Sequence, residues 1–228
     1  MIPPNIVEAA IDRGIHVLGI TDHNSAENVK AVRSAARGTD VTVIGGIEVS
    51  SAEEVHVLAL FDNDAELERF GQLIYQHLHG ANDPDAFGYQ WVVDEEGGVI
   101  DMNPRLLIGA TTMAIADVVE RVHEFEGVAI AAHVDRQSYS VVSQLGFIPG
   151  DLSLDAIELS PFFGTKGFAG SELIAAGGMV HPQVRFSDAH FVEEIARSST
   201  EFVMAEPTVA EIRLALRGEE GRMVVGRS

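Results

Sequence analysis

The chain has 228 residues, which is enough for one α/β domain with a sizeable core. It contains no cysteine, so disulfides and thiolate metal sites are excluded, and any metal must be held by histidine or carboxylate side chains. The 35 acidic and 15 basic residues give a net charge of −20, which disfavours long duplex nucleic acid as a partner because like charges repel. Without an apolar run of about 18 residues or a signal-peptide pattern, we expect a cytoplasmic protein with no membrane partner.

In chain order, the apolar spacing of the first 80 residues predicts alternating elements: a helix at 6–14, a strand at 16–20, a helix at 25–38, strands at 41–46 and 55–61, and a helix at 64–79. The helix at 25–38 has Ser25 as its expected N-cap and Gly38 just past its end. Gly14 is a natural stop for the first helix.

The rest of the chain continues the alternation: a hairpin at 89–102 with its turn at 95–98, a helix at 112–125, strands at 128–132, 153–159, 183–187 and 201–205, and a helix at 208–218. Strands that alternate with helices favour a parallel sheet or barrel. No linker-like shift in composition interrupts the pattern, so we expect one domain over residues 1–228.

Histidine and carboxylate side chains gather at the ends of the predicted strands. These candidates are His23, Glu48, His56, His133, Asp188 and His190. In a closed parallel barrel the carboxyl ends of the strands share one face, where active sites lie, so the six side chains are expected to converge. Nitrogen and oxygen ligands of this kind suit zinc, manganese or iron.

Each candidate also has an ordinary structural interpretation. His56, inside an apolar strand, would by itself more often be a satisfied core histidine. Asp22 would cap the helix that begins near Ser25, Glu48 would be a solvated loop carboxylate, and Asp188 would stabilise a helix N-terminus. Capping requires no histidines, however, so the joint placement favours metal binding. The remaining histidines are expected to be surface or packing residues: His16, His77, His79, His123 and His181.

Four motifs in order carry a resemblance to a known family: ITDHN at 20–24, GGIEVSS at 45–51 with VHVLAL at 55–60, AHVDR at 132–136 and SDAH at 187–190. They resemble the PHP (polymerase and histidinol phosphatase) family of metal-dependent phosphoesterases. The resemblance implies a distorted seven-stranded (β/α) barrel with a cleft for two or three divalent metal ions. It also implies hydrolysis of a phosphomonoester or phosphodiester by a hydroxide held between metal ions.

By position, the resemblance divides the candidates among three metals: His23 and His190 on the first, Glu48 bridging the second and third, His56 and His133 completing the second, and Asp188 completing the third. Glu48, His133 and Asp188 are the residues expected to carry catalysis. Arg136 is expected to hold a phosphate oxygen, with an ion pair to Asp135 as the alternative.

One departure from the family pattern concerns the start of the chain. The family begins with a strand that carries His-x-His and a further ligand in the next loop, whereas the first histidine here is His16. We therefore expect a barrel without its first strand and with fewer than three metals, occupied first at Glu48, His56 and His133. The alternative to an active phosphoesterase is a shortened, catalytically impaired barrel that serves as a metal-binding or scaffold module. An amidohydrolase-like enzyme fits the spacing less well.

The expected partners follow from the same pattern. The substrate is expected to be a small phosphorylated molecule or a short oligonucleotide, because bound cations can locally invert the negative field. Without a first barrel strand, residues 17–20 and 184–187 would have unpaired edges, and such edges seek partners. A homodimer formed through these edges is the expected outcome.

Overall fold

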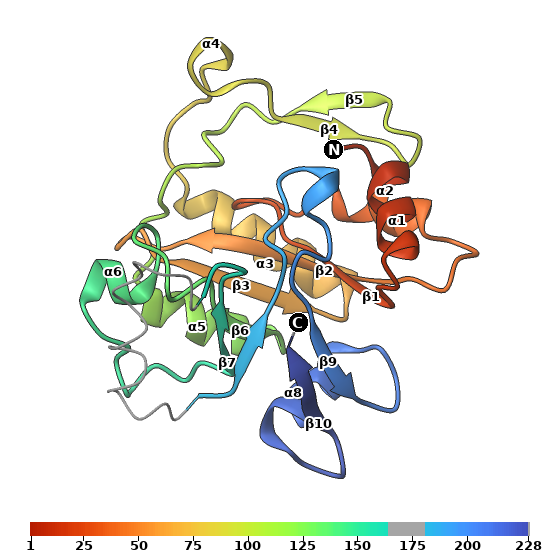
Figure 1. The fold of residues 1–228 in the computed structure, drawn as a ribbon. Helices are drawn as coiled ribbons and strands as arrows, with labels where there is room; N and C mark the ends of the chain where they lie inside the picture. Colours follow the sequence, from red (N-terminus) through yellow and green to blue (C-terminus); the bar gives the residue numbers. More distant parts are fainter. Residues whose placement is uncertain (164–180, 228) are drawn as a thin grey trace.

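The computed structural model describes residues 1–163 and 181–227. At its centre is a curled six-stranded sheet, a half-barrel of order β1-β2-β3-β6-β7-β8 (Figure 1). Its strands are β1 (Val17–Ile20), β2 (Thr42–Ser50), β3 (His56–Phe61), β6 (Val128–Ala131), β7 (Ala156–Leu159) and β8 (Gln183–Arg185). Two antiparallel pairs stand outside it: β4 (Trp91–Val93) with β5 (Val99–Met102), and β9 (Thr200–Val203) with β10 (Met223–Arg227).

Strand β3 runs against the rest of the sheet. It pairs antiparallel with both β2 and β6, whereas β1 with β2, β6 with β7, and β7 with β8 are parallel. The expectation of a parallel sheet or barrel is therefore wrong at this strand. Only residues 51–55 connect β2 to β3, and a parallel crossover needs a dozen or more residues. The reversal brings the start of β3, with His56, to the edge at which the other strands end.

Within the described residues the half-barrel is open, because β1 and β8 are its two ends and do not pair with each other. The strand predicted at 201–205 exists as β9, but it pairs with β10 instead of entering the sheet. The hairpin predicted at 89–102 is confirmed as β4 and β5. Pairing of the two end strands with a second chain stays a prediction.

The helices are α1 (Pro3–Asp12), α2 (Val29–Ala35), α3 (Asp64–His77), α4 (Pro84–Phe87), α5 (Ile115–Glu124), α6 (Val141–Leu145), the 3-10 helix η1 (Val192–Glu194) and α8 (Val209–Arg217). The predicted start of α2 is wrong: its N-cap is Asn28, and Ser25 instead shares a hydrogen bond of 2.9 Å with the hydroxyl of Tyr75. The short helices α4 and α6 and strand β10 were not predicted. No helix among the described residues is long and apolar enough to cross a membrane.

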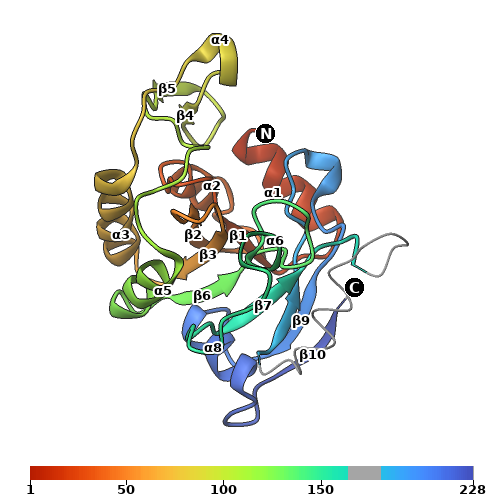
Figure 2. The same ribbon diagram turned by 90° about the vertical axis from the view of Figure 1, so that its left-hand side faces the viewer.

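Apolar side chains are buried on both faces of the sheet. Because neighbouring residues of a strand point to opposite faces, Val57, Ala59 and Phe61 of β3 join the core formed with α3 and α5, while Leu58 and Leu60 join the core formed with α8. We call these the α3–α5 face and the α8 face. Figure 2 shows α3 and α5 beside each other along the sheet, with α8 apart from them.

Candidate metal centre

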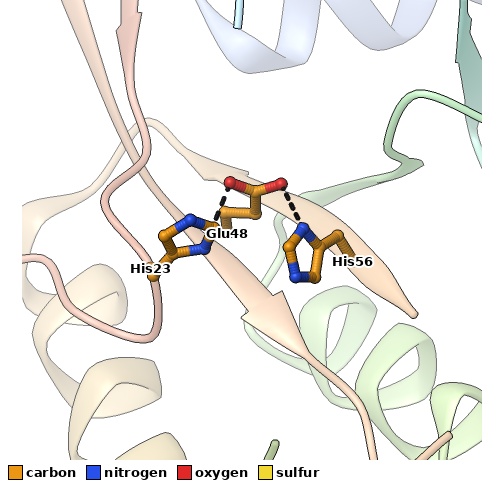
Figure 3. Close-up of side chains that lie close together, drawn as sticks. All are labelled: His23, Glu48 and His56. Atoms are coloured by element: carbon orange, nitrogen blue, oxygen red, sulfur yellow. Dashed lines mark ion pairs between the residues drawn. The ribbon is translucent and has the colours of Figure 1, made fainter. Parts of the chain in front are cut away.

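Three histidines surround the carboxylate of Glu48, which lies in β2 with only 6% of the residue exposed. Nδ1 of His56 lies 2.9 Å from Oε1, and Nε2 of His133 lies 3.4 Å from the same oxygen. Nδ1 of His23 lies 3.4 Å from Oε2 (Figure 3). The alternative of a solvated carboxylate at position 48 is therefore wrong, and three segments far apart in sequence deliver imidazoles to one carboxylate.

Strand register explains why two of these residues share a face. Glu48 lies opposite Leu58 across the β2–β3 pairing, and Leu58 points to the α8 face. His56 is two residues before Leu58 in the same strand, so it also points to that face. The apolar lining of the α8 face thus changes, near the carboxyl end of β2, into a carboxylate and an imidazole.

A backbone bridge and the side chain of Asn24 fix the loop that carries His23. This residue forms a parallel bridge with Glu48. The buried Asn24 beside it accepts the N–H of Ser50 at 3.1 Å and donates to the carbonyls of Leu107 and Gly109, both at 2.8 Å. Three segments are thereby tied together at His23: its own loop, β2 and residues 107–109.

His133 occupies a left-handed turn just past the end of β6, with φ of 30°. The N–H of His133 donates to Oε2 of Glu158 at 2.9 Å, and the N–H of Val134 donates to the backbone carbonyl of Glu158 at 2.8 Å. Glu158 is only 2% exposed, and burial raises the pKa of its carboxyl to about 8. Sequence analysis missed Glu158, although an acidic residue within the apolar run of β7 was a usable signal.

Asp188 is paired with a cation from the chain itself. Arg136 forms an ion pair with Oδ2 of Asp188, and Nδ1 of His190 lies 3.8 Å from Oδ1. The imidazole rings of His190 and His23 are 6.3 Å apart between centroids. These residues therefore border the group around Glu48, on its more exposed side.

The alternative pair between Arg136 and Asp135 is not formed. Both carboxylate oxygens of Asp135 accept hydrogen bonds from Ser160, one from its N–H and one from its hydroxyl, each at 2.6 Å. Asp135 is fully buried, and this contact joins the loop after β6 to the end of β7. Its role is structural, and it leaves Arg136 free to contact Asp188.

The histidine rings near Glu48 have unmet bonding capacity. Nδ1 of His23, of His56 and of His133 is buried without a hydrogen-bond partner among the described residues. A buried polar atom without a partner costs free energy, so an ion bound by these nitrogens would stabilise the group. Ligand atoms of His23, Glu48 and His56 all lie within 4.8 Å of one another. Two imidazole nitrogens and a carboxylate oxygen are a donor set that fits a divalent metal ion.

The protonation states agree with metal binding. Burial lowers the pKa of His23, against the opposing charge of Glu48, so the ring is neutral and can act as a ligand. Burial alone would raise the pKa of Glu48, but the contacting rings of His133 and His56 and the nearby His23 hold it far below its usual range. The carboxylate is therefore ionised, as a metal ligand must be.

Several non-glycine residues around the group have left-handed backbone conformations: Asn24 (φ 48°), His133 (φ 30°), Tyr139 (φ 58°) and Asp188 (φ 45°). Such conformations are uncommon outside glycine and gather at functional sites, where the surrounding structure holds them. Tyr139 is a second residue of the group that sequence analysis missed. Its ring stacks on the imidazole of His56, and nothing in the local sequence pattern indicates this contact.

Comparison with solved structures identifies the fold. The lesion-specific endonuclease EndoQ of Pyrococcus furiosus matches 100% of this chain with a TM-score of 0.68 and 19% identity. Endonuclease Q in complex with a 27-mer duplex substrate matches 98% with a TM-score of 0.66 and 17% identity. The chain spans about half the length of these two proteins, 54% and 53%.

A structure assigned as a metal-dependent phosphoesterase, from Bifidobacterium adolescentis, is similar over 83% of this chain and 82% of its own, with a TM-score of 0.51 and 16% identity. No curated protein sequence matches the chain. The family profile described as PHP domain matches residues 2–139, more than half of the sequence. The chain therefore belongs to the PHP domain family.

Proposed function

We propose that this protein hydrolyses phosphoester bonds with the help of divalent metal ions. The observation that carries the proposal is the group around Glu48, in which nitrogens of three histidines lie 2.9–3.4 Å from the oxygens of one buried carboxylate. Family membership and the likeness to a phosphoesterase fold support the same reaction class. A divalent ion bound there supplies Lewis-acid chemistry at a phosphoryl oxygen and lowers the pKa of water.

The chain's own residues have separate roles in this proposal. His23, Glu48 and His56 hold the first ion, because their ligand atoms are already gathered. His133 approaches the same carboxylate and completes the set. Asp188 and His190 lie on the more exposed side, where they would hold a second ion or orient the substrate. Each role is open to test by single substitution.

Arg136 is the candidate phosphate-binding residue. Its guanidinium lies at the open side of the group, with 35% of the side chain exposed, and it contacts Asp188. A guanidinium can exchange a carboxylate for a phosphate oxygen, because both accept two parallel N–H bonds. We infer that a bound phosphate takes over part of the contact that Arg136 makes with Asp188.

The proposed substrates are small phosphorylated molecules or short oligonucleotides. Two of the similar folds belong to endonucleases, which makes a phosphodiester the second bond type to test. The net charge of −20 argues against a long duplex, because its phosphates would be repelled outside the immediate metal site. A monoester and a diester of the same alcohol separate the two bond types.

A second candidate function is a metal-binding barrel with impaired catalysis. The observation in its favour is the ion pair between Arg136 and Asp188, because a cation already neutralises a carboxylate that a second metal would need. Among the described residues, only one group of three or more ligands meets within 4.8 Å. A single bound ion would polarise a phosphate but would not clamp both ends of a displacement.

Metal analysis and hydrolysis together test the two candidates. The protein, purified without chelator and then loaded with Mn²⁺ or Zn²⁺, is assayed for bound metal and for hydrolysis of p-nitrophenyl phosphate and bis(p-nitrophenyl) phosphate. His56→Ala is the site variant, and His79→Ala, at an exposed histidine outside the group, is the control. We expect metal-dependent hydrolysis by the wild type and by the control, and loss of metal with loss of hydrolysis in His56→Ala.

The other outcomes are equally informative. Bound metal without hydrolysis of either ester supports the impaired barrel. A chain that takes up no metal overturns both candidates. If His79→Ala lost metal as fully as His56→Ala, the assignment of the site around Glu48 would be wrong.

A further inference from the structure

The ring of Tyr139 lies flat against the imidazole of His56. Their centroids are 4.8 Å apart and their planes differ by 12°, so the two rings are stacked. His56 is buried, with 7% of the residue exposed, whereas Tyr139 is 43% exposed. Tyr139 therefore covers a proposed metal ligand on one side and faces solvent on the other.

The backbone holds this ring in place. Tyr139 has a left-handed conformation, φ 58°, which is unfavourable for a bulky residue. Its carbonyl accepts the N–H of His56 at 2.9 Å, so both its main chain and its side chain contact that histidine. The fully buried Ser140 that follows donates its hydroxyl to the carbonyl of Arg136 at 2.7 Å and caps α6. Strain kept in place by this many contacts indicates a functional position.

The same short turn carries the proposed phosphate-binding residue. Arg136 and Tyr139 lie at the two ends of the segment that the hydroxyl of Ser140 closes. Both side chains are partly exposed, as are those of His23 and His190, whereas His56 and Glu48 are buried. Each of the two side chains contacts a member of the group: Arg136 contacts Asp188, and Tyr139 stacks on His56.

We propose that Tyr139 is a specificity-determining residue that stacks on an aromatic group of the substrate, such as a nucleobase or a phenyl ring. This inference rests on the proposed phosphoesterase function and names its substrate class: phosphoesters of aromatic alcohols, nucleotides or short oligonucleotides with an unpaired base. His56 stacks on one face of the tyrosine ring, and 43% of the tyrosine is exposed to solvent, where a ligand can reach it. Stacking on aromatic side chains accepts any base, and the phosphate is left to Arg136 and the metal group.

Binding of two non-hydrolysable ligands tests this inference without turnover. Phenylphosphonate and methylphosphonate share the phosphonate group and differ in the aromatic ring. Their dissociation constants are measured by calorimetry for the Mn²⁺-loaded protein. We expect the wild type to bind phenylphosphonate about ten-fold more tightly, in keeping with one stacking contact.

The variants separate stacking from support of the metal ligand. Tyr139→Asn removes the ring but suits the left-handed backbone, so folding is preserved. Tyr139→Phe keeps the ring. Tyr89→Ala is the matched control, because Tyr89 is exposed and stacks on Trp91 in the same manner, with centroids 4.7 Å apart, but outside the metal group. We expect Tyr139→Asn alone to abolish the preference for phenylphosphonate, with methylphosphonate affinity and bound manganese unchanged.

Each other result counts against the inference. Equal loss of both phosphonates, or loss of manganese, in Tyr139→Asn would mean that Tyr139 acts only by positioning His56. A wild type that binds both ligands equally would leave the phosphate site standing and overturn the aromatic specificity. If the manganese-loaded wild type bound neither ligand, the proposed phosphoesterase site itself would be wrong, which the hydrolysis assay shows independently.

Discussion

The two ends of the α8 face are equally buried and chemically opposite. At one end, Leu60 and Ile130 pack against Ile212 of α8, and Ile130 is 0% exposed. At the other end, Glu48 and His56 point to the same face and are 6% and 7% exposed. The strands that form both ends are the same, so the difference lies in the side chains and in what closes each end.

The two ends differ in whether their side chains find all the contacts that they need. The apolar end is complete, because α8 supplies the contacts that its side chains need. The polar end has buried imidazole nitrogens without hydrogen-bond partners, which cost free energy unless an ion or another group binds them. Burial by itself therefore does not distinguish the candidate metal site from the core, whereas buried nitrogens without hydrogen-bond partners do.

The largest expected effect comes from a cavity at the apolar end. Ile130→Ala should lower the free energy of unfolding by about 2–5 kcal/mol, because β6 and α8 can close the space only in part. Urea denaturation measures it, and Ile100→Ala, at a residue that is 65% exposed, is the control with an expected change below about 0.5 kcal/mol. Metal uptake by the folded variant should be unchanged. A variant that lost metal at full stability would show that the two ends are not independent.

The polar end should gain stability from its ion. A divalent ion at about 100 times its dissociation constant should raise the free energy of unfolding by about 2.7 kcal/mol, because it binds the folded state alone. Glu48→Gln should abolish this gain, and the exposed Glu95→Gln should keep it. Thermal unfolding with Mn²⁺ and with chelator provides the measurement. An equal gain in Glu48→Gln would place the ion elsewhere.

A buried carboxylate near α8 gives the apolar end a dependence on acid. Asp155 accepts hydrogen bonds from His123 and from the N–H of Ala129, both at 2.9 Å. Burial opposes ionisation of Asp155, but these contacts hold its pKa below the usual 3.8. Its stabilising contribution is therefore present above about pH 3.8 and is lost as the pH falls through the lower folded-state pKa.

Asp155→Asn should cost about 1–3 kcal/mol at neutral pH and remove part of the acid-induced loss of stability. Unfolding curves between pH 3 and pH 7 test the sign of the effect. A variant whose stability fell with acid as steeply as that of the wild type would show that other carboxylates dominate.

The smallest expected effect concerns the start of α8. The Thr208 side chain accepts the N–H of Glu211, so Thr208→Ala should cost about 1 kcal/mol and Thr208→Ser should cost less. Denaturant midpoints resolve the difference. Loss of metal binding in Thr208→Ala would contradict the separation between the two ends of the face.

The sequence by itself located the strands of the half-barrel and the motifs that carry the candidate metal ligands. Apolar periodicity located the strands of the half-barrel, because alternating or continuous burial leaves a pattern that can be read locally. The motifs placed His23, Glu48, His56 and His133 at strand ends, where they are found. The antiparallel direction of β3 could also have been predicted, because residues 51–55 are too few for a parallel crossover.

Only the tertiary structure decided how these side chains are grouped. The ring of His23 lies nearer to that of His56 than to that of its expected partner His190, 5.1 Å against 6.3 Å between centroids, and Asp188 contacts Arg136. The stacking of Tyr139 on His56 was likewise not visible in the sequence. Distances between residues far apart in the chain depend on the curl of the sheet and on left-handed turns. Non-glycine residues adopt such turns only when their surroundings hold them. The local sequence pattern therefore does not predict these distances.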